Sequence, residues 1–194
     1  MGNVPQKLGA DAPAENAAAC DHEDRVAAGH VDKKRVGALT HELIAELLED
    51  GLRSPSPERI SATAARLPGL ADVGSYRMAV RQRILTSAAL YFRLFMPPAE
   101  WVFEGAELRA SRARFDLVWR SPAGVIVDEL KTGRSATRRE IAAVREQAAR
   151  ETAAGTMVFG AQFLGVRVVS LGAPRTSFFC DRDGQSTLLD WGTR

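Results

Sequence analysis

Residues 125–133 read Val125-Ile126-Val127-Asp128-Glu129-Leu130-Lys131-Thr132-Gly133, an apolar run that acquires two acids and a lysine before it ends in a turn. An apolar run of this length that stops at a glycine is typical of a buried β-strand. In a strand, alternate side chains share a face, so Glu129 and Lys131 point to one side while Asp128 points to the other. The stretch therefore predicts a strand that carries an acid and a base together.

A second apolar strand with a single acid lies just upstream, at Phe115-Asp116-Leu117-Val118-Trp119. The residues between the two strands, Ser121-Pro122-Ala123-Gly124, have the composition of a turn. Together they predict a β-hairpin with strands over about residues 114–120 and 125–131.

The register of this hairpin follows from its loop. If the loop is the four turn residues, Arg120 faces Val125, and Asp116 then lies opposite Glu129, with Cβ atoms roughly 5 Å apart. Two carboxylates that face each other in a buried hairpin need a cation, a shared proton or a neighbouring lysine. A divalent ion would supply that compensation.

Composition places the chain among ordinary globular proteins. It has 194 residues, 45% hydrophobic and 26% charged, with a formal net charge of +2 that permits nucleic-acid binding without requiring it. It has neither an apolar run of about 18 residues nor a secretion signal, so we expect a cytoplasmic protein without a membrane span. Cys20 and Cys180 are too few for a disulfide framework or a cysteine-only iron–sulfur cluster, and we expect neither.

Residues 1–30 lack apolar periodicity and are rich in alanine, glycine, proline and charge, which predicts a flexible N-terminal tail before one domain at 31–194. Within that domain, apolar residues recur at helical spacing in four segments. We expect helices over about residues 36–50, 57–67, 75–95 and 135–154, the last with Ser135 as its N-cap and Gly155 as its stop. We expect further strands over 101–109, 163–171 and 177–180.

Four patterns follow one another along the chain: Gly37-x-x-x-His41, Asp116, Glu129-x-Lys131 and Gln147. Their order resembles the RecB-like branch of the PD-(D/E)XK nuclease superfamily, over most of residues 37–171. The chain departs from the family at Glu151, where a tyrosine often stands. The resemblance implies an α/β domain with the restriction-endonuclease-like fold, a central mixed sheet flanked by helices.

The resemblance also implies a metal site. Asp116 and Glu129, with the backbone carbonyl of Leu130, would hold Mg²⁺ or Mn²⁺, which favour oxygen ligands, and His41 would complete the shell.

It further implies the catalytic set Asp116, Glu129, Lys131 and Gln147. Lys131 would orient or deprotonate the attacking water, or offset charge that develops on phosphorus. Gln147 would position Lys131, the water or a phosphate.

Simpler interpretations exist for each residue taken singly. Asp116 and Lys131 can form a plain salt bridge, His41 can pack beside the apolar stripe of its helix, and Gln147 can be an exposed helix residue. Asp128 faces away and can pair with an arginine or a helix N-terminus. Glu104 and Glu107 are weaker auxiliary candidates for the site.

The patterns together predict a metal-dependent deoxyribonuclease that hydrolyses phosphodiester bonds of single- or double-stranded DNA. Two alternatives stay open: a catalytically silent nucleic-acid-binding or complex-assembly module on the same scaffold, and a phosphodiesterase directed at RNA or nucleotides. The chain has no GxxxxGK[ST] phosphate loop, so any helicase motor would be a separate protein partner.

Overall fold

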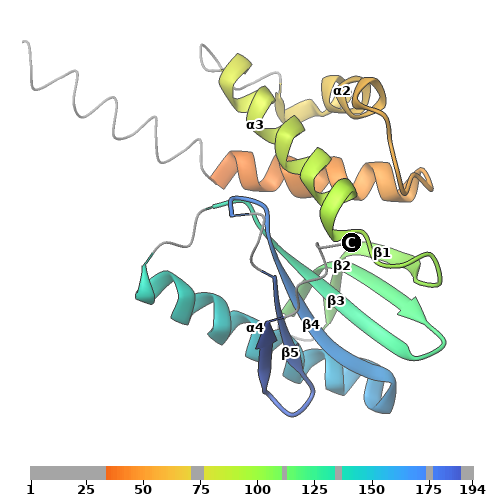
Figure 1. Ribbon diagram of the computed structural model, residues 1–194, viewed down its shortest axis with the longest axis vertical. Coiled ribbons are helices and arrows are strands. Elements are labelled where there is room, and N and C mark those ends of the chain that lie inside the picture. The colour runs from red at the N-terminus through yellow and green to blue at the C-terminus, as the bar shows by residue number, and fades with distance from the viewer. Residues whose placement is uncertain (1–33, 71–76, 111–112, 134–136, 174–176, 189–194) are drawn as a thin grey trace, which may run out of the picture.

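The computed structural model describes residues 34–70, 77–110, 113–133, 137–173 and 177–188. These residues form an α/β structure in which a mixed sheet lies between helices (Figure 1). The predicted α/β class, with a central mixed sheet flanked by helices, is thus confirmed. The N-terminal tail expected at 1–30 lies outside the described residues.

Six strands of the described chain form one sheet in sequence order. Neighbouring strands are antiparallel except β3 and β4, which are parallel and are joined through a helix, as a parallel pair requires. The last strand was not predicted. The strands are β1 (Val102–Ala110), β2 (Ala113–Ser121), β3 (Gly124–Lys131), β4 (Phe163–Ser170), β5 (Ser177–Asp181) and β6 (Ser186–Leu188).

The hairpin of β2 and β3 has the predicted register. Arg120 pairs with Val125, and the ladder continues to the pair Leu117 and Asp128. The ladder ends there, one position before Asp116 would meet Glu129, so the two carboxylates share a strand end without forming a backbone pair.

The helices form two layers. Residues 34–49 form the first described helix, which ends near Gly51 as predicted. The other helices are α2 (Pro57–Arg66), α3 (Arg77–Leu90), a π-helical turn (Tyr91–Phe95) and α4 (Arg138–Phe159), with 3₁₀ turns at Pro68–Leu70 and Gly160–Gln162.

Successive side chains of β3 point to opposite faces of the sheet, where they join two separate apolar cores. Ile126 and Leu130 pack with the first helix, α2 and α3, whereas Val125 and Val127 pack with α4. Figure 1 shows these two helical layers on either side of the strands. Glu129 therefore lies on the α4 side of the sheet, as the period of two predicts.

Both predicted ends of α4 were wrong. Thr137, not Ser135, is the N-cap: its hydroxyl accepts a hydrogen bond from Glu140 N, and its own backbone N–H donates one to the Glu140 carboxylate, which completes a capping box. Gly155 does not stop the helix. A Cβ there would lie 2.3 Å from the Phe163 ring, so this glycine permits close packing of α4 on the sheet.

The expected helix at 75–95 is also interrupted, since α3 ends at Leu90 and a π-helical turn follows. This turn buries Tyr91 and Phe95, and the Phe95 carbonyl accepts a hydrogen bond from Arg167 of β4. A long-range polar contact thus accompanies the widened turn, and local spacing carries no signal for it.

Candidate active site

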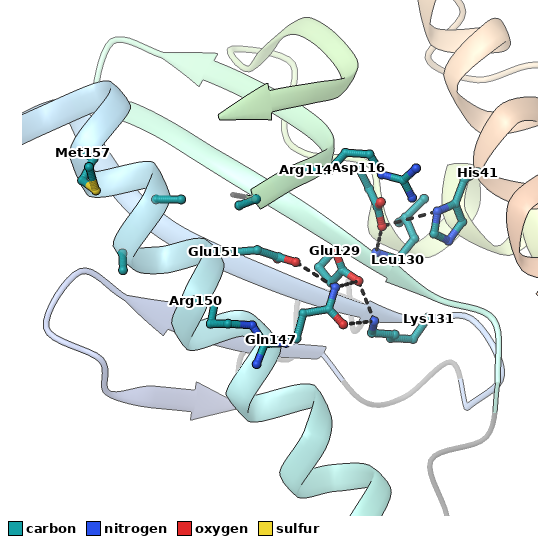
Figure 2. A pocket seen from close by; sticks show the side chains of 13 residues that line it. His41, Arg114, Asp116, Glu129, Leu130, Lys131, Gln147, Arg150, Glu151 and Met157 are labelled. Carbon is teal, nitrogen blue, oxygen red and sulfur yellow. Dashed lines mark hydrogen bonds and ion pairs between the residues drawn. The ribbon is translucent and has the colours of Figure 1, made fainter. Parts of the chain in front are cut away.

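One pocket contains all six residues that the sequence predicted for the site. It has a volume of about 640 Å³ and opens between the first helix, the ends of β2 and β3, and α4 (Figure 2). The predicted residues that line it are His41, Asp116, Glu129, Leu130, Lys131 and Gln147.

Asp116 occupies the point where β2 separates from β3. Its Oδ2 accepts a hydrogen bond of 2.8 Å from the backbone N–H of Leu130, and the carboxylate thereby takes the place of a ladder partner. The same oxygen lies 3.4 Å from His41 Nδ1. Burial raises the pKa of Asp116, but the hydrogen bond and charge of His41, the Leu130 N–H and the charge of Lys131 together hold this pKa below its usual value.

His41 is half-buried and faces Asp116 across the pocket, so packing beside the apolar stripe does not account for its position. Burial lowers the pKa of His41, yet the hydrogen bond and charge of Asp116 raise it above its ordinary value. Gly37 lies one turn earlier, where a Cβ would be 3.2 Å from Thr132 Oγ1. A glycine at this place lets the helix approach the end of β3, which gives the Gly-x-x-x-His spacing a physical reason.

A second group of polar side chains joins β3 to α4. Lys131 Nζ lies 2.5 Å from Glu129 Oε1 and 2.7 Å from Gln147 Oε1. The Gln147 amide donates to Glu129 Oε1 at 2.7 Å and to Glu151 Oε1 at 2.8 Å. Lys131 thus pairs with Glu129 and, among the described residues, forms no ion pair with Asp116. The plain salt-bridge interpretation is therefore wrong in its partner.

The pocket concentrates negative charge in a poorly solvated place. Burial and then the charge of Asp116 raise the pKa of Glu129, against the opposing effect of Lys131. Burial and then the charge of Glu129 raise the pKa of Glu151 to about 8. Asp116, Glu129 and Glu151 are thus three buried carboxyl groups with few cationic partners. A bound divalent cation would relieve the repulsion between them.

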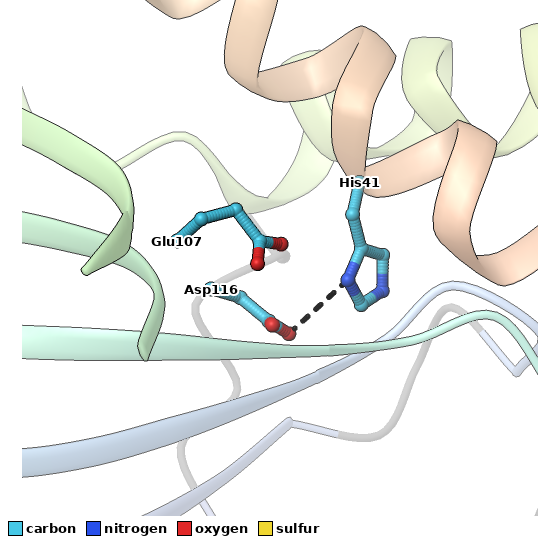
Figure 3. A group of neighbouring side chains, drawn as sticks. All are labelled: His41, Glu107 and Asp116. Carbon is cyan, nitrogen blue, oxygen red and sulfur yellow. Dashed lines mark ion pairs between the residues drawn. The ribbon is translucent and has the colours of Figure 1, made fainter. Parts of the chain in front are cut away.

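The donor atoms fit a divalent cation, with one change to the predicted ligands. His41, Asp116 and Glu107 each offer a ligand atom, and these atoms lie within 4.8 Å of one another (Figure 3). Glu129 is not in this triad; its Oε1 accepts hydrogen bonds from Lys131 and Gln147. Carboxylate oxygens suit Mg²⁺ and Mn²⁺, and an imidazole is compatible with Mn²⁺.

Glu107 was only an auxiliary candidate in the sequence. The pairs of Ala106 with Leu117 and of Leu108 with Phe115 place it across from Asp116 in the β1–β2 ladder. The register of β1 on β2 was therefore the signal that would have found it. Glu104, the other auxiliary acid, instead pairs with Arg120 away from the pocket.

Asp128 lies on the opposite face of β3, as predicted, and is fully buried. Its carboxylate accepts hydrogen bonds from Arg167 Nε at 2.7 Å and Nη2 at 2.6 Å, and from the Tyr91 hydroxyl at 2.8 Å. The predicted pairing with an arginine is confirmed, and Asp128 is not part of the pocket.

Comparisons with protein-family models and with curated proteins give no match to this chain. None of the helices in the described ranges has the length and apolar character that crossing a membrane requires.

Proposed function

We propose that this protein is a divalent-metal-dependent nuclease that hydrolyses DNA phosphodiester bonds, with the restriction-endonuclease-like fold of the RecB-like PD-(D/E)XK enzymes. One observation carries the proposal. An acid from β2, an acid and a lysine from β3, a histidine from the first helix and a glutamine from α4 converge in one pocket, in the arrangement that this chemistry needs.

The metal would be held by Asp116 and Glu129, with His41, the Leu130 carbonyl and the neighbouring Glu107 as further donors. Bound Mg²⁺ or Mn²⁺ supplies Lewis acidity toward water and a phosphate oxygen. The hydrogen bond from Leu130 N–H fixes the Asp116 carboxylate where β2 and β3 separate.

Lys131 acts as a cation beside the reacting phosphate. Its contacts with Glu129 and Gln147 hold the ammonium group in place, so it can stabilise negative charge that develops on phosphoryl oxygens without reorganisation. Because Nζ is in an ion pair, this role is favoured over removal of a proton from water. Gln147 positions Lys131 through its carbonyl oxygen.

The pocket has basic residues on its α4 side and an acidic groove on the side of the first helix, which supports a nucleic-acid substrate bound on the α4 side. Arg150 is exposed at the rim, and other exposed arginines continue along α4. The adjoining groove along the first helix is acidic, with Glu42, Glu46 and Glu49 in its lining. A phosphate backbone is attracted to the first surface and repelled by the second. The α4 arginines are Arg138, Arg139, Arg145 and Arg150.

The test is cleavage of labelled single-stranded DNA, double-stranded DNA and RNA with Mg²⁺, with Mn²⁺ and with EDTA. We expect metal-dependent cleavage of DNA that falls at least about 100-fold in Lys131→Ala, because a preorganised charge is lost from the transition state. Lys34→Ala, an exposed lysine of the first helix, is the matched control and should cleave normally.

Three outcomes would contradict the proposal or a part of it. Folded wild type that binds DNA but does not cut it would favour the binding or assembly module. Preferential cleavage of RNA would favour the RNA-directed phosphodiesterase. Unchanged cleavage by Lys131→Ala would remove the assigned role of this lysine.

A further inference from the structure

Glu151 is a buried acid that the residues predicted from sequence do not include. It lies one turn after Gln147 on α4, is only 3% exposed and lines the same pocket. Its Oε1 accepts the hydrogen bond from Gln147, whereas its buried Oε2 accepts none from any described residue. Figure 2 shows the Glu151 carboxyl group directed at Gln147 and Glu129.

A single nitrogen links this acid to Glu129. Gln147 Nε2 lies 2.7 Å from Glu129 Oε1 and 2.8 Å from Glu151 Oε1, so the two oxygens are close neighbours. Divalent cations bind carboxylate oxygens at about 2.0 to 2.6 Å. A small adjustment of these side chains would therefore let one cation take an oxygen from each.

The contact with Gln147 does not by itself require a glutamate here, because it uses Oε1 alone and needs no charge. The second oxygen is buried without a donor from any described residue, and Glu129 lies beside the carboxyl group. In the metal-free protein a proton shared between Glu151 and Glu129 offsets their repulsion, and a bound cation would take the place of that proton. A carboxyl group that costs stability in the metal-free protein is expected where a ligand compensates for it.

We propose that Glu151 is a metal ligand, and that with Glu129 it forms a second divalent-cation position beside the His41, Glu107 and Asp116 triad. This inference rests on the proposed nuclease site and deepens it, because it assigns the pocket two cation positions. The first uses ligands from the first helix, β1 and β2 together with Glu129 and the Leu130 carbonyl of β3, and the second shares Glu129 and adds Glu151 of α4.

The experiment is calorimetric titration of the full chain with Mn²⁺, without nucleic acid. We expect two Mn²⁺ ions per wild-type chain. Glu151→Gln, which keeps the shape and the Gln147 contact, should lose one ion or bind it at least about tenfold more weakly. The matched control is Glu146→Gln, an exposed acid of the same helix, which should bind both ions as wild type does.

A single Mn²⁺ per wild-type chain, or unchanged affinities in Glu151→Gln, would overturn the inference. A wild-type count of one overturns the inference even if the variant fails to fold. Glu151→Ala is a second variant, which lacks the carboxyl oxygens and should also lose one ion. Circular dichroism checks that it is folded.

The inference and the proposed function can fail separately. Wild type that binds two ions, one of which Glu151→Gln loses, but that cuts no nucleic acid would contradict the nuclease while supporting Glu151 as a ligand. Wild type that cuts DNA while Glu151→Gln still binds both ions would do the reverse. Lys131→Ala should retain both ions, since Lys131 is not a ligand.

Discussion

Asp128 and Glu129 are adjacent in β3 and both are buried, yet their surroundings differ in kind. Asp128 receives two hydrogen bonds from one buried arginine and a third from a tyrosine. Glu129 accepts hydrogen bonds from Lys131 and from the Gln147 amide, and Lys131 also donates to Gln147. The carboxyl groups of Asp116 and Glu151 lie beside it. The comparison teaches that a fully paired buried charge supports the fold, whereas an incompletely compensated one lies where we propose that a cation and a substrate bind.

The largest effect on the free energy of unfolding should come from replacing the basic partner of each acid, Arg167 or Lys131, by methionine. Arg167→Met leaves Asp128 buried without its counter-charge and should lower the free energy of unfolding by about 3 to 5 kcal/mol. Lys131→Met, on the partly exposed pocket side, should change it by less than about 1 kcal/mol while cleavage is lost. Urea unfolding measures both. Equal losses of stability would erase the distinction between the two faces.

Isosteric neutralisation of the two acids should have effects of opposite sign. Asp128→Asn leaves Arg167 buried without a carboxylate and should cost at least about 2 kcal/mol. Glu129→Gln should stabilise the metal-free protein by roughly 1 kcal/mol, because burial and Asp116 raise the pKa of Glu129 and thus disfavour its charged form. Thermal unfolding in EDTA at pH 7 measures both. Destabilisation by Glu129→Gln would show that its charge is compensated after all.

The smallest stepwise effect is the change in metal-free stability with each pH unit. Burial and the charge of Glu129 raise the pKa of Glu151 from 4.5 to about 8, so the folded state holds this proton more tightly than the unfolded state. Stability should therefore fall as pH rises from about 5 to 8, by on the order of 1 kcal/mol per pH unit. The raised pKa values of Glu129 and His41 act in the same direction, and the lowered pKa of Asp116 matters only in more acidic solution.

Unfolding in EDTA between pH 5 and pH 8 tests this slope. Glu151→Gln should flatten it, while Glu146→Gln should leave it unchanged. A slope that is the same in wild type and in Glu151→Gln would show that this acid titrates normally in the folded protein.

The relative positions of several site residues were predictable because these residues lie within one strand or one hairpin. Alternation along β3 places Glu129 and Lys131 together and Asp128 apart, and the short loop sets the hairpin register as far as Leu117. The end of α4 was not predictable in this way. Gly155 looks like a helix stop in the sequence, but its lack of a side chain serves the contact with Phe163.

By itself, the sequence determined which residues share a face of β3 and which patterns precede and follow that strand, since the periods of strands and helices are properties of the local backbone. Only the tertiary structure decided that Glu107 lies across from Asp116, that Glu151 reaches Gln147, and that Arg167 compensates Asp128. These contacts join elements distant in the chain. Their energies depend on burial and on the charges that packing brings together, which no local period encodes.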